Sequence, residues 1–127
     1  MKKIIVIDDE QAICDVICLI LGLDGYTVQS FPTGEALLDR FKNEFHPPDV
    51  FILDYHLAGM NGLQLCRMLK EKEGTSVVPV IMVSGTPDIA PILLTGGADF
   101  FLEKPFELND MLRIIKRCTV SNREAPE

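Results

Sequence analysis

Apolar residues along this 127-residue chain fall into two alternating patterns. Short unbroken apolar runs are typical of strands buried on both faces, and apolar residues three or four positions apart are typical of amphipathic helices. The pattern predicts strands at residues 4–7, 26–28, 50–53, 77–83 and 100–102. The helices between and after them carry their apolar residues at positions 13–21, 37–45, 65–69, 89–94 and 108–115.

Five strands that alternate with five helices predict one α/β domain, in which helices cover both faces of a parallel sheet. By analogy with flavodoxin-like doubly wound folds, we expect the strand order 2-1-3-4-5. Thr33 and Asn61 are expected to cap the second and third helices. We expect the domain to span residues 1–120, with residues 121–127 as a flexible tail or the start of a linker.

The fourth helical segment contains Pro87 and Pro91. Proline is tolerated in the first turn of a helix, but in the interior it removes a hydrogen bond and costs about 3 kcal/mol. We therefore predict a fourth helix that is short or displaced.

Composition narrows the function classes. The formal net charge is -7 with no cluster of Lys or Arg, which disfavours direct nucleic-acid binding. No apolar stretch reaches the about 18 residues of a membrane span, and the N-terminus lacks signal-peptide features, so we expect a cytoplasmic protein without a membrane segment. The cysteines are interpreted as small buried apolar residues rather than disulfide or zinc ligands: Cys14, Cys18, Cys66 and Cys118.

Polar residues follow four of the five predicted strands. Asp8 and Asp9 follow the first strand, Asp54 the third, Ser84 the fourth and Lys104 the fifth. Ligands of open α/β sheets bind at the carboxyl ends of the strands, so these side chains should meet there. Crowded carboxylates favour a hard cation such as Mg2+, for which Mn2+ can substitute, and a lysine suits a phosphoryl oxygen. The pattern indicates a site where a carboxylate receives a phosphoryl group.

The chain, its tail aside, resembles the response-regulator receiver family of two-component signal transduction, including the chemotaxis regulators. Each matching motif is weak alone, and the order and spacing of all of them carry the resemblance. The motifs are Val6–Glu10, Phe51–Asp54 with the later Gly62, Val83–Gly85, Gly97–Asp99 and Lys104–Phe106.

The resemblance implies that Asp54 accepts a phosphoryl group from the phosphohistidine of a sensor histidine kinase. It implies that Asp9 and Asp54 bind Mg2+ directly, that Asp8 assists through water, and that the backbone carbonyl of His56 is a further ligand. Lys104 would pair with the phosphoryl group. The family members are not enzymes in the usual sense, although they assist their own phosphorylation and autodephosphorylation.

The resemblance also implies a switch, in which Ser84 turns inward to the phosphoryl group and the aromatic Phe101 follows. His56 and Thr86 lie two residues beyond Asp54 and Ser84, where family members tune the lifetime of the phosphate. The peptide bond before Pro105 is expected to be cis.

The chain departs from the family pattern at three places. Leu57-Ala58 stands where a Met-Pro pair is usual, and we expect Gly59 to supply a different turn. The switch aromatic, often Tyr, is Phe101 and has no hydroxyl to report its position. Because the fourth helix is expected to be short, we also predict an atypical output surface.

Three other functions were weighed. A pseudo-receiver that only mediates binding stays open, although it would be favoured if the acids or the lysine were missing. A haloacid-dehalogenase-like phosphatase would carry its nucleophile in an Asp-x-Asp motif after the first strand, where this chain has Asp8-Asp9. A flavodoxin-like cofactor binder would have its phosphate repelled by these acids. The output partner or effector domain is unknown, and a relay role or a homodimer formed on phosphorylation stays open.

Overall fold

The computed structural model describes residues 2–124, apart from the side chains of residues 87 and 120–124. Strands and helices alternate along it, as the hydrophobic pattern predicts. The strands are β1 Lys3–Ile7, β2 Thr27–Phe31, β3 Val50–Asp54, β4 Val80–Ser84 and β5 Phe100–Glu103. The helices are α1 Gln11–Leu23, α2 Gly34–Asn43, α3 Gly62–Glu71, α4 Ala90–Thr95 and α5 Leu108–Glu124.

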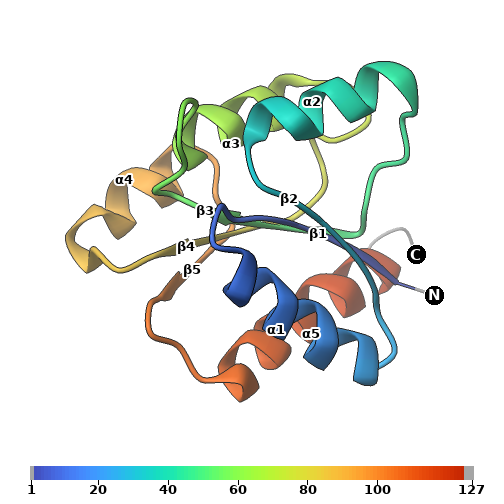
Figure 1. Ribbon diagram of the computed structural model, residues 1–127, viewed down its shortest axis with the longest axis vertical. Helices are drawn as coiled ribbons and strands as arrows, with labels where there is room; N and C mark the ends of the chain where they lie inside the picture. The colour runs from blue at the N-terminus through green and yellow to red at the C-terminus, as the bar shows by residue number, and fades with distance from the viewer. Residues whose placement is uncertain (1, 125–127) are drawn as a thin grey trace.

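The strands form one parallel sheet in the order β2-β1-β3-β4-β5, which confirms the expected flavodoxin-like topology. Helices α1 and α5 cover one face of the sheet, and α2 and α3 cover the other (Figure 1). In the register, Ile7 of β1 lies beside Leu53 of β3 and Ser84 of β4 beside Glu103 of β5. The residues at the carboxyl ends of β1 and β3 are therefore neighbours at the same end of the sheet.

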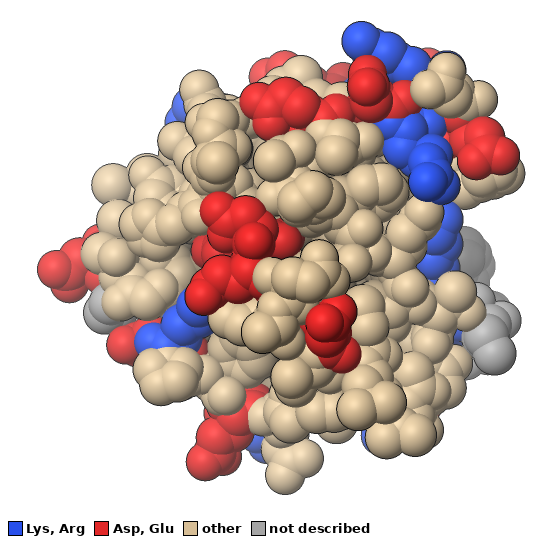
Figure 2. Space-filling model, in the orientation of Figure 1, with Lys and Arg blue, Asp and Glu red and all other residues tan. Residues whose placement is uncertain are grey.

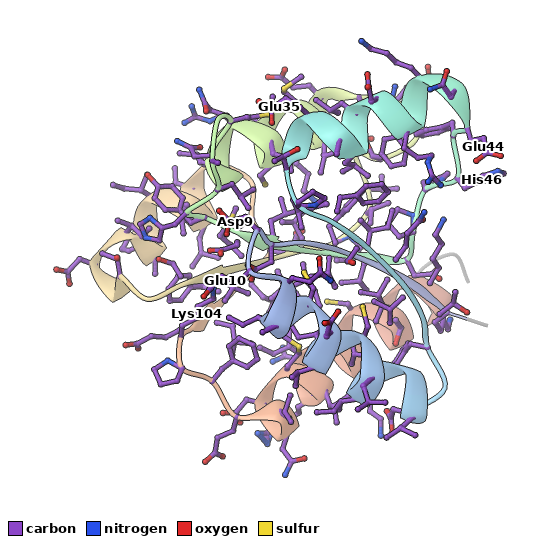
Figure 3. The ribbon with its side chains drawn as sticks, viewed as in Figure 1. Asp9, Glu10, Glu35, Glu44, His46 and Lys104 are labelled. Atoms are coloured by element: carbon purple, nitrogen blue, oxygen red, sulfur yellow. The ribbon has the colours of Figure 1, made fainter. Side chains whose placement is uncertain are left out.

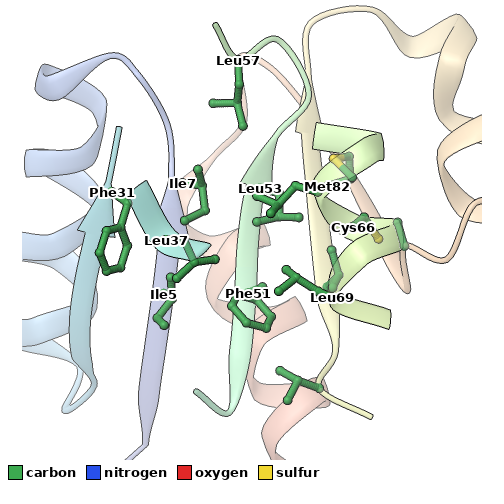
Figure 4. Close-up of a cluster of buried hydrophobic side chains, with 14 of the residues drawn as sticks. Ile5, Ile7, Phe31, Leu37, Phe51, Leu53, Leu57, Cys66, Leu69 and Met82 are labelled. Atoms are coloured by element: carbon green, nitrogen blue, oxygen red, sulfur yellow. The ribbon is translucent and has the colours of Figure 1, made fainter. Parts of the chain in front are cut away.

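Each central strand is apolar throughout because both of its faces are buried. Ile5 and Ile7 point to the cluster under α2 and α3, and Ile4 and Val6 point to the cluster under α1 and α5. Figure 4 shows the first cluster, with side chains from neighbouring strands meeting those of the covering helices. This two-sided burial explains the unbroken apolar runs, since side chains alternate between the two faces of a strand.

Both expected helix caps are confirmed. The Thr33 hydroxyl accepts a hydrogen bond from the Ala36 amide at 3.1 Å. The Asn61 side chain accepts from the Gln64 amide, and the Gln64 side chain accepts in return from the Asn61 amide, both at 2.9 Å. This capping box fixes where α3 starts, directly after the loop that leaves β3.

Element boundaries differ from the prediction in three places. β2 begins at Thr27 and continues to Phe31, so it is longer than predicted. β4 begins only at Val80, because residues 75–78 form a turn closed by the Val78 amide on the Thr75 carbonyl. α2 ends at Asn43, before the Phe45 that the pattern assigned to it.

The fourth helix is short, as its prolines predict. A 3-10 turn at Pro87–Ile89 leads into α4, which has six residues. Pro91 lies in the first turn of α4, where its missing N–H breaks no helical hydrogen bond. Ile92 and Leu94 of this helix are exposed, at 59% and 43%, and a role of this surface in output stays a prediction.

At the other end of the chain, α5 continues to Glu124, so residues 121–124 of the expected tail are helical. Residues 125–127 lie outside the described part, and the domain boundary at residue 120 stays a prediction.

The cysteines are all free, and Cys14, Cys66 and Cys118 are buried among apolar side chains, as expected. Burial raises the pKa of the Cys66 thiol to about 11, which keeps it protonated and unreactive at neutral pH. Across residues 2–124, no helix is both long and apolar enough to cross a lipid bilayer.

Candidate functional site

The site begins with two buried carboxylates at the ends of neighbouring strands. Asp54 is the last residue of β3 and Asp8 the first after β1, and the strand register sets them side by side. Each is only 5% exposed. Asp8 accepts a hydrogen bond from the Glu10 amide at 2.9 Å, and Asp54 accepts one from the His56 amide at 3.1 Å. Each carboxylate is thus held by the loop that leaves its own strand.

Lys104 reaches both carboxylates from the far side of β4. Its Nζ lies 3.0 Å from Asp54 Oδ2 and 3.4 Å from Asp8 Oδ2. Its own amide donates to the Ser84 carbonyl at 2.9 Å, which anchors the start of the β5–α5 loop to the end of β4. The Lys104–Pro105 peptide is cis, as expected. The structure thus brings together three site residues that are far apart in the sequence.

A third acid belongs to this group, and it is Glu10 rather than Asp9. One carboxylate oxygen each of Asp8, Glu10 and Asp54 lie within 4.8 Å of one another, and Glu10 Oε1 is 3.6 Å from Lys104 Nζ. Asp9 is exposed and lies outside this group. Figure 3 shows Asp9, Glu10 and Lys104 at the same end of the sheet, and Figure 2 shows the acids gathered on the surface there.

Sequence reasoning missed Glu10 because it treated the two adjacent aspartates as the pair. The signal was present, since residues two apart in an extended segment share a side, and Glu10 is still extended where it precedes α1. A direct metal-ligand role for Asp9 stays a prediction.

Burial and mutual repulsion make this group receptive to positive charge. Burial raises the pKa of Asp8 above its ordinary 3.8, and the nearby charge of Asp54 raises it further, against the hydrogen bond from Glu10 and the charge of Lys104. Burial alone would lower the pKa of Lys104, but its hydrogen bond to Asp54 and the charges of Asp54 and Asp8 outweigh that effect and raise it. Lys104 therefore stays charged at neutral pH, while the ionised form of Asp8 is disfavoured.

The hydroxyl predicted as the switch lies beside the two residues predicted to tune the phosphate lifetime. Ser84 is fully buried, and its Oγ accepts a hydrogen bond from the Thr86 amide at 3.0 Å. The His56 ring nitrogen Nε2 lies 3.4 Å from Ser84 Oγ and 3.3 Å from Thr86 Oγ1. His56 therefore links the loop after β3 to the loop after β4. Phe101 is partly buried against the cluster under α2 and α3, and its switching role stays a prediction.

The donor set fits a hard divalent cation. Mg2+ prefers oxygen ligands and is commonly held by one or two carboxylates together with water and phosphate oxygens. Asp8, Glu10 and Asp54 supply carboxylate oxygens, and Lys104 brings one positive charge to these three acids. Lys104 contacts these carboxylates, and Ser84 ends the strand next to the one that ends in Asp54; together the lysine and the hydroxyl could bind a phosphoryl group.

Replacement of Lys104 by Met is expected to destabilise the metal-free protein by about 3 kcal/mol at neutral pH, because it leaves buried carboxylates without their cation. Among the described residues, Lys104 is the only basic side chain in an ion pair with this group. Urea unfolding of both proteins in EDTA, with and without added Mg2+, measures the effect.

The loss should shrink when Mg2+ is added and when the pH falls. A carboxyl with a raised folded pKa binds more protons in the folded than in the unfolded state, so stability rises as pH falls through that window. The loss should also disappear at alkaline pH, because the stabilisation from Lys104 is lost as pH rises through its raised pKa. Equal stability of the two proteins at neutral pH would contradict the expectation.

Comparison with known proteins shows the family and the fold. The profile of the response regulator receiver domain matches residues 4–116, which is most of the chain. The chain belongs to the response regulator receiver family. Response regulator ArlR of Staphylococcus epidermidis is 34% identical over 116 residues, which cover 91% of this chain and 52% of that protein. DNA-binding response regulator MtrA of Mycolicibacterium smegmatis is 27% identical over 98% of this chain and 54% of its own.

Solved receiver structures share the fold. The signal receiver domain of a signal transduction histidine kinase from Syntrophus aciditrophicus superposes with a TM-score of 0.88 at 26% identity, covering 98% of this chain and 94% of that one. A putative response regulator from Chloroflexus aurantiacus gives 0.86 at 26% identity, covering 94% and 98%. This receiver chain spans about half the length of the curated relatives it matches.

Proposed function

We propose that this receiver domain accepts a phosphoryl group on Asp54 from the phosphohistidine of a sensor histidine kinase, with Mg2+ bound at the acid group. The observation that carries the proposal is the contact of Lys104 Nζ with Asp54 Oδ2 at 3.0 Å beside the buried Asp8. Phosphoryl transfer to a carboxylate needs a nucleophilic carboxylate, a fixed positive charge and acids that can bind a metal ion. We assign these parts to Asp54, to Lys104 and to the acid group, which consists of Asp8, Glu10 and Asp54.

In the proposed reaction, an oxygen of Asp54 attacks the phosphorus as the phosphorus–nitrogen bond of the donor breaks, and the histidine leaves with the electron pair. Mg2+ held by carboxylates of the group Asp8, Glu10 and Asp54 would supply positive charge to neutralise the incoming phosphoryl oxygens. Lys104 exchanges its contact with Asp54 for one with a phosphoryl oxygen. The Ser84 hydroxyl donates to another phosphoryl oxygen, so it must leave its present position beside His56.

We propose that the donor protein docks in a groove of about 620 Å³. It runs between α1 and the start of the β5–α5 loop, and Lys104 lines it as well as contacting Asp54. Val16, Leu19 and Leu23 continue the apolar surface along α1, at 50%, 64% and 81% exposed. Because the groove is lined by apolar residues and by the Lys104 that contacts Asp54, we propose that it receives an apolar surface of the donor protein close to the phosphohistidine.

His56→Ala is expected to shorten the lifetime of the phosphorylated protein about fivefold, which corresponds to about 1 kcal/mol in the hydrolysis barrier. In the unphosphorylated protein the ring lies beside Ser84 and Thr86. After Ser84 has turned to the phosphoryl group, we expect the bulk of the ring to restrict the access of water to Asp54, so its removal opens a path for water. The decay of the phosphorylated species, followed by intact mass after removal of the donor, measures the lifetime. His56→Phe keeps the bulk of the ring and should decay at close to the wild-type rate; an unchanged rate in His56→Ala would remove the idea.

The proposed function is tested by incubating the protein with acetyl phosphate, with and without Mg2+, and recording its intact mass. The expected result is a gain of one phosphoryl group that requires Mg2+. No gain under either condition would identify the chain as a pseudo-receiver, in which the acid group and Lys104 serve only structure or binding.

A further inference from the structure

The loop between β3 and α3, residues 55–61, is held by side chains at both of its ends. It begins at the phosphoacceptor, where the His56 amide donates to Asp54 Oδ1 at 3.1 Å. In its middle, the Leu57 side chain is 8% exposed and packs in the cluster under α2 and α3. Beyond Leu57 the chain has Ala58 and Gly59, which impose little conformational restriction of their own.

A side chain from α2 holds the far end of this loop. The Glu35 carboxylate oxygen Oε2 accepts a hydrogen bond from the Met60 amide at 3.2 Å, across 25 residues of sequence. Glu35 lies in the first turn of α2, and the Thr33 cap fixes the direction of that turn. Figure 3 shows Glu35 at the start of α2, beside the loop that enters α3.

Gly59 is the residue that lets this carboxylate come so close. Its φ is +74°, which favours glycine over residues with a Cβ. A Cβ at Gly59 would also lie 2.9 Å from Glu35 Oε2, nearer than real Cβ contacts allow. A residue with a Cβ at position 59 would therefore displace the Glu35 carboxylate from its present position.

We propose that Glu35 is a positioning residue for the phosphorylation site, and that it acts by holding the loop of residues 57–60 through the Met60 amide. The inference rests on the proposed function. Since His56 at the start of the loop is tied to Asp54 and Met60 at its end is tied to Glu35, the segment between them is held at both ends. Release of the far end gives the loop more conformations and leaves the backbone around His56 less ordered for Mg2+ binding.

The test compares Glu35→Ala, Glu35→Gln and Asp39→Ala with the wild-type protein. Glutamine keeps an acceptor oxygen but removes the charge. Asp39 is an exposed acid on the same helix, so its replacement matches the change in net charge without touching the loop. Three measurements are made: hydrogen exchange of the Met60 amide in metal-free protein, Mg2+ binding by calorimetry, and the rate of labelling by acetyl phosphate against Mg2+ concentration.

In Glu35→Ala, we expect the Met60 amide to exchange about tenfold faster, because the backbone hydrogen bond that protects it is lost. The Mg2+ concentration for half-maximal binding and labelling should rise about threefold, while the labelling rate at saturating Mg2+ stays at the wild-type value. Glu35→Gln and Asp39→Ala should both behave as the wild type.

Unchanged Mg2+ affinity in Glu35→Ala would overturn the proposal. A threefold loss in Asp39→Ala or in Glu35→Gln would overturn it as well, because charge rather than the hydrogen bond would then carry the effect. If the wild-type protein itself neither binds Mg2+ nor is labelled, the proposed function fails and the positioning role fails with it. Faster exchange at Met60 in Glu35→Ala would then still show that the hydrogen bond restrains the loop. By contrast, a wild-type protein that binds Mg2+ and is labelled, together with unchanged Mg2+ affinity in Glu35→Ala, would overturn the positioning role alone.

Discussion

Asp54→Asn is expected to abolish Mg2+-dependent labelling by acetyl phosphate, with less than about one per cent of the wild-type rate remaining. The neutral amide has no anionic oxygen to attack phosphorus. The substitution also removes one negative charge from the acid group. Asparagine has nearly the same shape as aspartate, so the fold should persist, with Lys104 still paired with Asp8. Intact mass measures labelling, and thermal unfolding checks the fold.

Asp9→Asn and Glu10→Gln serve as controls for the loss of one charge. Both keep Asp54 and should keep labelling at saturating Mg2+, so neither should resemble Asp54→Asn. These two variants also test which of Asp9 and Glu10 contributes more to Mg2+ binding. The position of Glu10 within the acid group predicts that Glu10→Gln raises the Mg2+ requirement more than Asp9→Asn does. Persistent labelling of Asp54→Asn would place the acceptor elsewhere, and peptide mapping would locate it.

Gly62→Ala is expected to destabilise the protein by about 3 kcal/mol or more, although alanine is the better helix former. A Cβ at Gly62 would lie 2.5 Å from the Asp54 carbonyl oxygen and 2.8 Å from Tyr55 Cα. Both are backbone atoms that cannot move without displacing the end of β3, and the Met82 sulfur lies only 3.0 Å away. Because the displaced residue is the proposed phosphoacceptor, labelling should fall together with stability.

Gly22→Ala is the matched control, since Gly22 lies in α1 and an added Cβ would meet nothing within 4 Å. That change should stabilise the protein by about 0.5–1 kcal/mol through helix propensity. Urea unfolding of the two variants and the wild type provides the comparison. A Gly62→Ala protein as stable as Gly22→Ala would show that the end of β3 yields without cost.

The hydrophobic pattern predicted the fold well because each element leaves a local signal. Unbroken runs such as residues 4–7 mark strands buried on both faces, and Thr33 and Asn61 mark helix starts through hydrogen bonds that span three residues. Pro91 predicted a short fourth helix for an equally local reason. The errors in β2, β4 and α2 lie at element ends, where the outcome depends on turns and neighbouring elements rather than on the pattern.

The sequence by itself determined which chemical groups stand at the strand ends, including Asp8, Asp54, Ser84 and Lys104. These positions follow from chain order, because the residues after buried parallel strands lie at the carboxyl ends of those strands, on the same end of the sheet. Only the tertiary structure decided which groups come into contact. It placed Glu10 rather than Asp9 with the other acids, set His56 against Ser84, and brought Glu35 to the loop after β3. Such contacts depend on distances of a few ångströms between separate elements, and no local pattern of residues encodes those distances.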